Sequence, residues 1–174
     1  MSEIINRIAK SKLETIDLED LYIDGKRTQL DISQWLYEGL LLREKEFRAH
    51  LKAHDWSQYN NQLVALYCST DAIVPSWAFM LVSVHLNNFA KKVVKGSLTD
   101  LNLALYAEQI QRFDTTPYAD LPVIIKGCAN KPVPETAYLL LLEKLQPIAK
   151  LIMYGEACSS VPLFKKKINK AKSN

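Results

Sequence analysis

The strongest constraint on the fold is an alternation of short apolar runs and longer helical segments in the second half of the chain. The runs at residues 63–67, 91–95, 121–125 and 151–154 have the length and composition of buried strands. Helical segments at residues 75–89, 98–113 and 134–144 separate them. Strands that alternate with helices are typical of parallel crossover connections. We therefore predict an α/β fold with a mainly parallel sheet of about four strands and helices on its faces.

The N-terminal part of the chain precedes this alternation of runs and helices. The stretch up to about Lys26 is polar with scattered apolar residues, which predicts a short helix or an arm packed on the domain. Asp31 and Ser33 are candidate caps for a helix that begins near Gln34 and ends near Asp55. At the other end, residues 165–174 are rich in lysine and predict a flexible basic tail on a single domain of residues 1–164.

Composition excludes a disordered, collagen-like or membrane chain. The chain has 174 residues, 48% of them hydrophobic and 24% charged, which suits one globular domain. The net charge of +3 lies largely in the tail, so we do not expect a nucleic-acid partner. The partners that we consider are a small molecule, another protein or a second copy of the chain. No apolar run reaches the roughly 18 residues of a membrane helix, and no signal peptide is recognisable, so we expect a cytoplasmic protein without membrane contact.

The three cysteines share a position in this pattern. Cys68, Cys128 and Cys158 each follow an apolar run, and each is followed within a few residues by Val-Pro. Carboxyl ends of parallel strands meet at one edge of a sheet, where α/β proteins bind their ligands. The sequence therefore predicts that the three thiols lie together at that edge.

Thiols in this position favour metal binding. The positive end of a following helix lowers the pKa of a nearby thiol, and the thiolate is the form that binds metals. Three thiolates and a fourth ligand, for which Asp71 and His85 are candidates, would form a zinc site. An open fourth position would permit hydrolysis by a metal-dependent enzyme. An iron–sulfur cluster is the alternative cofactor, and the lack of a Cys-x-x-Cys pair weakens both assignments.

Two other functions fit the same residues. Free cysteine is often a buried small hydrophobe, so the chain could be a non-catalytic binding or interaction module with inert thiols. A protein that responds to redox conditions through a reactive thiol is the third hypothesis. Nucleotide binding has no support, because the sequence contains no Gly-rich phosphate loop.

Three segments carry a family resemblance. They are DWSQY at 55–59, KGCANKP at 126–132 and GEACS at 155–159. These segments resemble a bacterial family known only as a domain of unknown function, DUF2480, and the resemblance covers nearly the whole chain except the basic tail. It implies a bacterial, cytosolic, single-domain protein, and it supplies no activity, substrate or catalytic residue.

Overall fold

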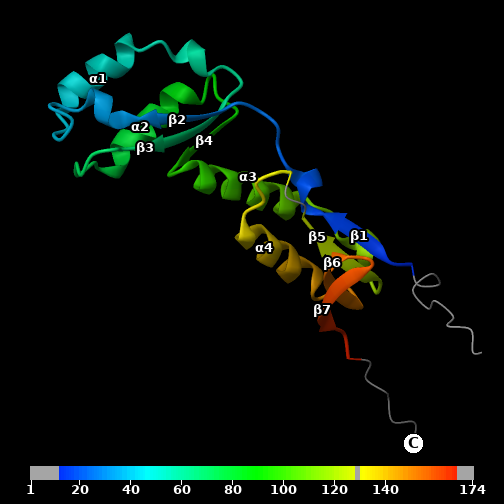
Figure 1. Cartoon of the computed structure of the whole chain (residues 1–174). Helices are drawn as coiled ribbons and strands as arrows, with labels where there is room; N and C mark the ends of the chain where they lie inside the picture. The colour runs from blue at the N-terminus through cyan, green and yellow to red at the C-terminus, as the bar shows by residue number, and fades with distance from the viewer. Residues whose placement is uncertain (1–11, 128–129, 168–174) are drawn as a thin grey trace, which may run out of the picture. The chain divides into compact units, whose positions relative to one another are not determined.

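The computed structural model describes residues 12–127 and 130–167 and confirms the α/β class (Figure 1). Its contacts divide the chain into two compact units. One, the three-stranded unit, comprises Ile23–Leu105. The other, the four-stranded unit, combines the residues up to Tyr22 with those from Tyr106 onward. A mainly parallel four-stranded sheet is present, as predicted, but the four predicted strands are divided between this sheet and a second sheet of three parallel strands.

The three-stranded unit is built around a buried central strand. Its strands run in the order β2-β3-β4 and are all parallel. Its elements are β2 (Arg27–Asp31), η2 (Ile32–Trp35), α1 (Glu44–Ala53), η3 (Trp56–Tyr59), β3 (Leu63–Tyr67), α2 (Ser76–Leu86), β4 (Lys92–Lys95) and the start of α3 (Leu98–Arg112). Val64 and Leu66 pack in one hydrophobic cluster with residues of α1 and α2. Leu63 and Ala65 pack in another with Leu101 of α3, because successive strand residues point to opposite faces.

The four-stranded unit joins the two ends of the chain. Its strands run in the order β1-β5-β6-β7, and β7 is antiparallel to β6. Its elements are β1 (Glu14–Asp17), η1 (Leu18–Leu21), the end of α3, η4 (Thr116–Tyr118), β5 (Pro122–Lys126), α4 (Glu135–Leu145), β6 (Leu151–Glu156) and β7 (Ser159–Lys165). Val123 and Ile125 of β5 pack with Leu141 of α4 and with Tyr106 and Ile110 of α3.

The two units contain copies of one structural repeat. Residues 44–96 align with residues 103–155 without a gap, and within this alignment β3 and β5, as well as α2 and α4, have the same bounds. Identical residues occur at Asp55/Asp114, Tyr59/Tyr118, Val64/Val123, Val74/Val133, Pro75/Pro134, Ala78/Ala137, Leu81/Leu140, Leu86/Leu145, Ala90/Ala149, Lys91/Lys150 and Gly96/Gly155. Backbone details agree as well, since Asn61 and Asp120 both have positive φ angles, of 60° and 55°.

The first strand of each unit extends the repeat. Asp31 at the end of β2 pairs with Tyr67, and Asp17 at the end of β1 pairs with Lys126, which is the residue equivalent to Tyr67. Each aspartate then caps the 3-10 helix that follows it, through a hydrogen bond from the backbone N–H two residues ahead. The three-stranded copy is thus inserted, along the chain, into the four-stranded one.

Most predicted elements of the second half are confirmed within two or three residues. The helix predicted from near Gln34 is wrong in its start, because α1 begins only at Glu44. The chain turns before it, at Glu38 and Gly39, where φ is 51° and 71° and a right-handed helix cannot continue. Strands β1, β2 and β7 were not predicted. In the described part of the chain, no helix has the length and apolar character needed to cross a membrane.

Candidate functional site

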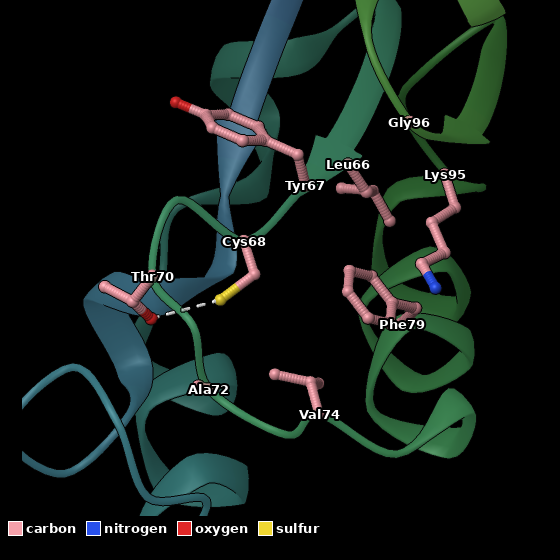
Figure 2. Close-up of a pocket in the computed structure, with 9 residues that line it drawn as sticks. All are labelled: Leu66, Tyr67, Cys68, Thr70, Ala72, Val74, Phe79, Lys95 and Gly96. Atoms are coloured by element: carbon pink, nitrogen blue, oxygen red, sulfur yellow. Dashed lines mark hydrogen bonds between the residues drawn. The ribbon is translucent and has the colours of Figure 1, made fainter.

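A pocket lies at the carboxyl edge of the three-stranded sheet (Figure 2). It has a volume of about 280 Å³ and is formed by the ends of β3 and β4, the loop after β3 and the first turn of α2. Its lining residues are Leu66, Tyr67, Cys68, Thr70, Ala72, Val74, Phe79, Lys95 and Gly96. This is the edge at which parallel α/β sheets bind ligands.

The pocket combines apolar walls with one cation. Val74 and Phe79 supply apolar surface, and the Lys95 Nζ lies 4.6 Å from the centre of the Phe79 ring. Within residues 12–127 and 130–167, no carboxylate pairs with Lys95. On another wall, the Cys68 Sγ is 3.4 Å from the Thr70 Oγ1, and that hydroxyl donates a hydrogen bond to the Gly39 carbonyl. The pocket therefore offers a positive charge, a thiol and apolar contact to a ligand.

A carboxylate holds the loop that forms this pocket. Asp31 accepts hydrogen bonds from the backbone N–H groups of Ser33 and Ser69, at 2.9 and 3.1 Å, and from the Ser69 hydroxyl at 2.5 Å. Partial burial would raise the pKa of Asp31, but the hydrogen bonds from Ser69 and Ser33 outweigh it, so the pKa is lowered. The ionised carboxylate thereby ties the loop after β3 to the end of β2.

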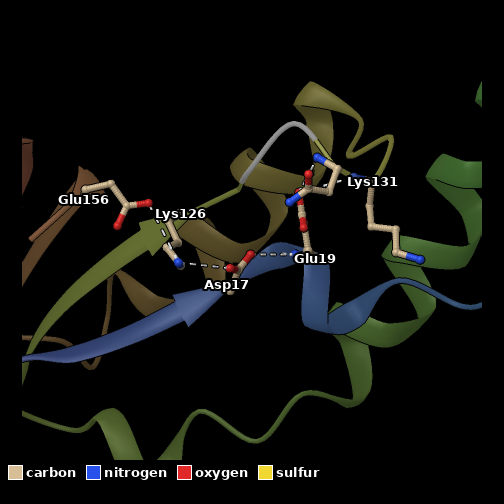
Figure 3. Close-up of polar contacts among 6 residues, drawn as sticks. Asp17, Glu19, Lys126, Lys131 and Glu156 are labelled. Atoms are coloured by element: carbon tan, nitrogen blue, oxygen red, sulfur yellow. Dashed lines mark hydrogen bonds and ion pairs between the residues drawn. The ribbon is translucent and has the colours of Figure 1, made fainter.

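The four-stranded unit has a corresponding tie at its own carboxyl edge (Figure 3). Glu19 accepts hydrogen bonds from the backbone N–H groups of Asn130 and Lys131, at 3.0 and 3.2 Å, and so connects η1 to the loop after β5. The Lys126 Nζ lies 3.3 Å from a carboxylate oxygen of Asp17 and 3.8 Å from one of Glu156. Charged groups at this edge are therefore paired with one another.

The residues equivalent to the pocket wall are different in the four-stranded unit. Gly127 replaces Cys68, Tyr138 replaces Phe79 and Tyr154 replaces Lys95. A Cβ atom added to Gly127 would overlap the Tyr138 hydroxyl, so this tyrosine fills the space that the cysteine side chain takes in the other copy. The Tyr138 and Tyr154 rings meet edge to face at 5.7 Å. At these two positions of the repeat, the cation and the thiol thus occur in the three-stranded unit and not in the four-stranded one.

The structure distributes the predicted metal ligands over both units. Cys68 lines the pocket, whereas Cys158 is exposed in the turn between β6 and β7, at the carboxyl end of a strand in the other sheet. Cys128 lies outside the described residues. Asp71 is exposed in the loop after β3, and His85, in the last turn of α2, stacks on Trp56 with ring centres 5.1 Å apart.

The three-cysteine metal site consequently stays a prediction. No cluster of three or more His, Cys, Asp or Glu side chains suited to a metal occurs within the portion of the chain that the structure describes. Among the proposed ligands that the structure describes, only Cys68 lines the pocket. Sequence analysis missed Lys95 and Phe79 as site residues. Because most aligned positions differ between the two copies, the internal repeat by itself does not single them out.

Comparisons with known proteins give a family without an activity. Neither a search of curated proteins nor a search of solved structures finds a significant match. The profile of one family, described as a protein of unknown function (DUF2480), matches residues 2–166. This match covers nearly the whole chain and agrees with the three segments that carry the resemblance. The chain therefore belongs to the DUF2480 family.

Proposed function

We propose that this protein is a binding module that takes a small carboxylate with an apolar body in the pocket beside Lys95. The observation that carries the proposal is the Lys95 ammonium group, which lines the pocket without a carboxylate partner among the described residues. A ligand carboxylate would supply that partner, and a charge-assisted hydrogen bond of this kind is among the stronger polar contacts.

The surroundings of Lys95 favour the same ligand class. Helix α2 begins beside the pocket and has no side-chain cap, so its partial positive charge adds to that of the lysine. Val74 and Phe79 would contact the apolar part of the ligand. The equivalent position in the four-stranded unit has Tyr154 and not a lysine. The repeat therefore folds without a cation at this position, so a structural role does not explain the presence of Lys95.

Ligand binding can be tested with benzoate and 3-methylbutanoate, and with benzamide as the uncharged comparison. We expect the two carboxylates to shift the amide NMR signals of Gly96 and Ala72, and benzamide to bind more weakly. Lys95→Gln should weaken carboxylate binding by roughly tenfold or more, because a hydrogen bond to a charged group contributes about 1.5–3 kcal/mol. Lys91→Gln, at the amino end of β4, is the matched control and should bind as the wild type does.

The two described thiols provide a second readout. Alkylation of Cys68 by iodoacetamide should slow when benzoate fills the pocket, while exposed Cys158 reacts at an unchanged rate as an internal control. Equal benzoate affinity in Lys95→Gln, or NMR shifts confined to residues away from the pocket, would show that the proposal is wrong.

A zinc-type site of Cys68, Cys128 and Cys158 is a second proposal, with a metal-dependent enzyme as its extension. It is supported by the free state of Cys68 and Cys158 and by the exposure of Cys158. Protein purified without added metal should then contain about one zinc per chain, and a folded triple Cys→Ser variant should contain none. Zinc retained by that variant contradicts the ligand assignment. For both proposals we expect the cytoplasm, where thiols stay reduced.

A further inference from the structure

Helix α2 presents an exposed apolar ridge between two grooves. Met80 and Val84, one turn apart, are 67% and 63% exposed and form the ridge. On the α1 side, the groove is lined by Trp77 and Leu81 together with Glu44 and Arg48 of α1. On the β4 side, the groove is lined by apolar atoms, by the small side chains of Ser76 and Ser83, and by Lys95, which also lines the proposed ligand pocket. A ridge with a groove on either side is the surface that helices use to pack together.

The repeat shows that this face of α2 is unusual for its place in the fold. The equivalent positions on α4 carry Thr136 in place of Trp77 and Glu143 in place of Val84, whereas Met80 has a similarly exposed apolar counterpart in Leu139. Three inner positions are buried in both helices, as Ala78, Val82 and Leu86 in α2 and as Ala137, Leu141 and Leu145 in α4. The changes at Trp77 and Val84 lie outside these positions. The outer face of α4 therefore has Glu143 one turn from Leu139, whereas the ridge of α2 is apolar at both corresponding positions, as is typical of a contact surface.

We propose that two copies of this chain pair through α2, related by a twofold axis. The same helix presents both ridge and groove, so the ridge of one copy fits a groove of the other and the contact is satisfied twice. The charges on the α1 side are self-complementary as well. Glu44 and Arg48 lie on one groove rim, and a twofold axis can bring the glutamate of each copy to the arginine of the other. Their present ion pair within α1 is exposed and contributes little to stability, so exchange costs little.

The oligomeric state tests this directly. Light scattering after size-exclusion chromatography should give twice the chain mass for the wild type, with dissociation on dilution. Val84→Glu introduces the residue type found at the equivalent α4 position and should give the monomer mass with an unchanged circular dichroism spectrum, because a carboxylate would be buried at the contact. Leu139→Glu, on α4 and 64% exposed, is the matched control and should remain dimeric.

Charge exchange tests the orientation of the pair. Glu44→Arg and Arg48→Glu should each weaken the dimer, because like charges then face each other, and the double variant should restore it. A wild-type chain that is monomeric at all concentrations overturns the proposal. A dimer that survives Val84→Glu, or that is lost with Leu139→Glu, also overturns the proposal. A monomer whose α2 face binds a different protein overturns it as well.

Discussion

At the scale of single residues, a few substitutions between the repeats decide which copy has an open pocket. Gly127 in the four-stranded unit and Cys68 in the three-stranded unit occupy the same place after a central strand. The glycine has no Cβ, so the Tyr138 side chain can approach the backbone closely. The Tyr138 side chain therefore packs closely only if residue 127 is a glycine.

Gly127→Ala should destabilise the protein by about 1–3 kcal/mol, because the added methyl group overlaps the Tyr138 hydroxyl. Urea unfolding followed by circular dichroism measures the loss. Adding Tyr138→Phe removes the overlapping oxygen, so the double variant should be more stable than the sum of the two single losses implies. Strictly additive losses would mean that the two residues do not compete for this space.

A second residue-scale feature is the environment of His54. Its ring contacts the rings of Trp35 and Trp56, with centres 5.1 and 4.6 Å away, and its Nε2 is 3.2 Å from the Tyr59 hydroxyl. Burial lowers the pKa of His54 from its ordinary value, and the nearby charge of Asp55 opposes this shift only in part. The folded protein thus favours the neutral imidazole.

The free energy of unfolding should fall as the pH drops below about 6.5, the ordinary pKa of histidine. In that range the unfolded chain takes up a proton on His54 that the folded chain resists, so protonation favours unfolding. Urea titrations at about pH 7.5 and 5.5 measure the difference. His54→Phe, which copies the aromatic Phe113 of the other repeat, should reduce it, and an undiminished pH effect would contradict this assignment.

At the scale of elements, α2 and α4 use the same inner positions and differ on the outside. Leu86 and Leu145 end the two helices at equivalent positions, and both are fully buried. Val74-Pro75 precedes α2 and Val133-Pro134 precedes α4. Proline suits the start of a helix because it has no N–H that would be left unpaired. The repeat therefore preserves how each helix begins, packs and ends.

Leu86→Ala and Leu145→Ala should each cost about 2–5 kcal/mol, because each removes buried methyl groups and leaves a cavity. Denaturant unfolding measures both. Leu139→Ala, on the exposed side of α4, is the comparison and should change the stability by less than about 0.5 kcal/mol. Similar effects for Leu145→Ala and Leu139→Ala would show that the inner and outer faces of α4 have been misassigned.

At the scale of the whole molecule, the chain closes one sheet with segments from its two ends. Strand β1 pairs with β5, with Thr15 opposite Ile124, although the entire three-stranded unit lies between them in the sequence. Ile16 of β1 is 4% exposed and packs in the same cluster as Val123 and Ile125. The N-terminal strand is therefore part of the core of the four-stranded unit.

Ile16→Ala should lower the stability by about 2–4 kcal/mol, because it removes core volume from that cluster. Thr15→Ala changes the adjacent, exposed position of the same strand and should cost less than about 1 kcal/mol. Thermal unfolding followed by circular dichroism compares the two. An Ile16→Ala protein as stable as Thr15→Ala would mean that β1 does not dock on β5.

The sequence by itself determined the elements whose signal is local. Strands β3 and β5 contain runs of consecutive buried apolar residues, because a strand covered on both faces needs apolar residues at successive positions. Strand β6 begins with the apolar run 151–154, and all three strands were predicted nearly to their ends. Strands β1 and β2 have one buried residue each, Ile16 and Leu30, so nothing in their composition separates them from a polar loop. Their strand character comes from partners that lie far along the chain.

Tertiary structure alone decided how these elements divide into two sheets and where the pocket opens. Strand pairing depends on hydrogen bonds between segments that are distant in the sequence. The residues of a strand such as 63–67 do not by themselves indicate which other strand pairs with it. The same holds for the candidate site. The cysteines form a pattern in the sequence, but the sequence does not predict that Lys95 lines a pocket. The end of β3, the Phe79 ring and the loop after β3 surround Lys95 only when the unit folds.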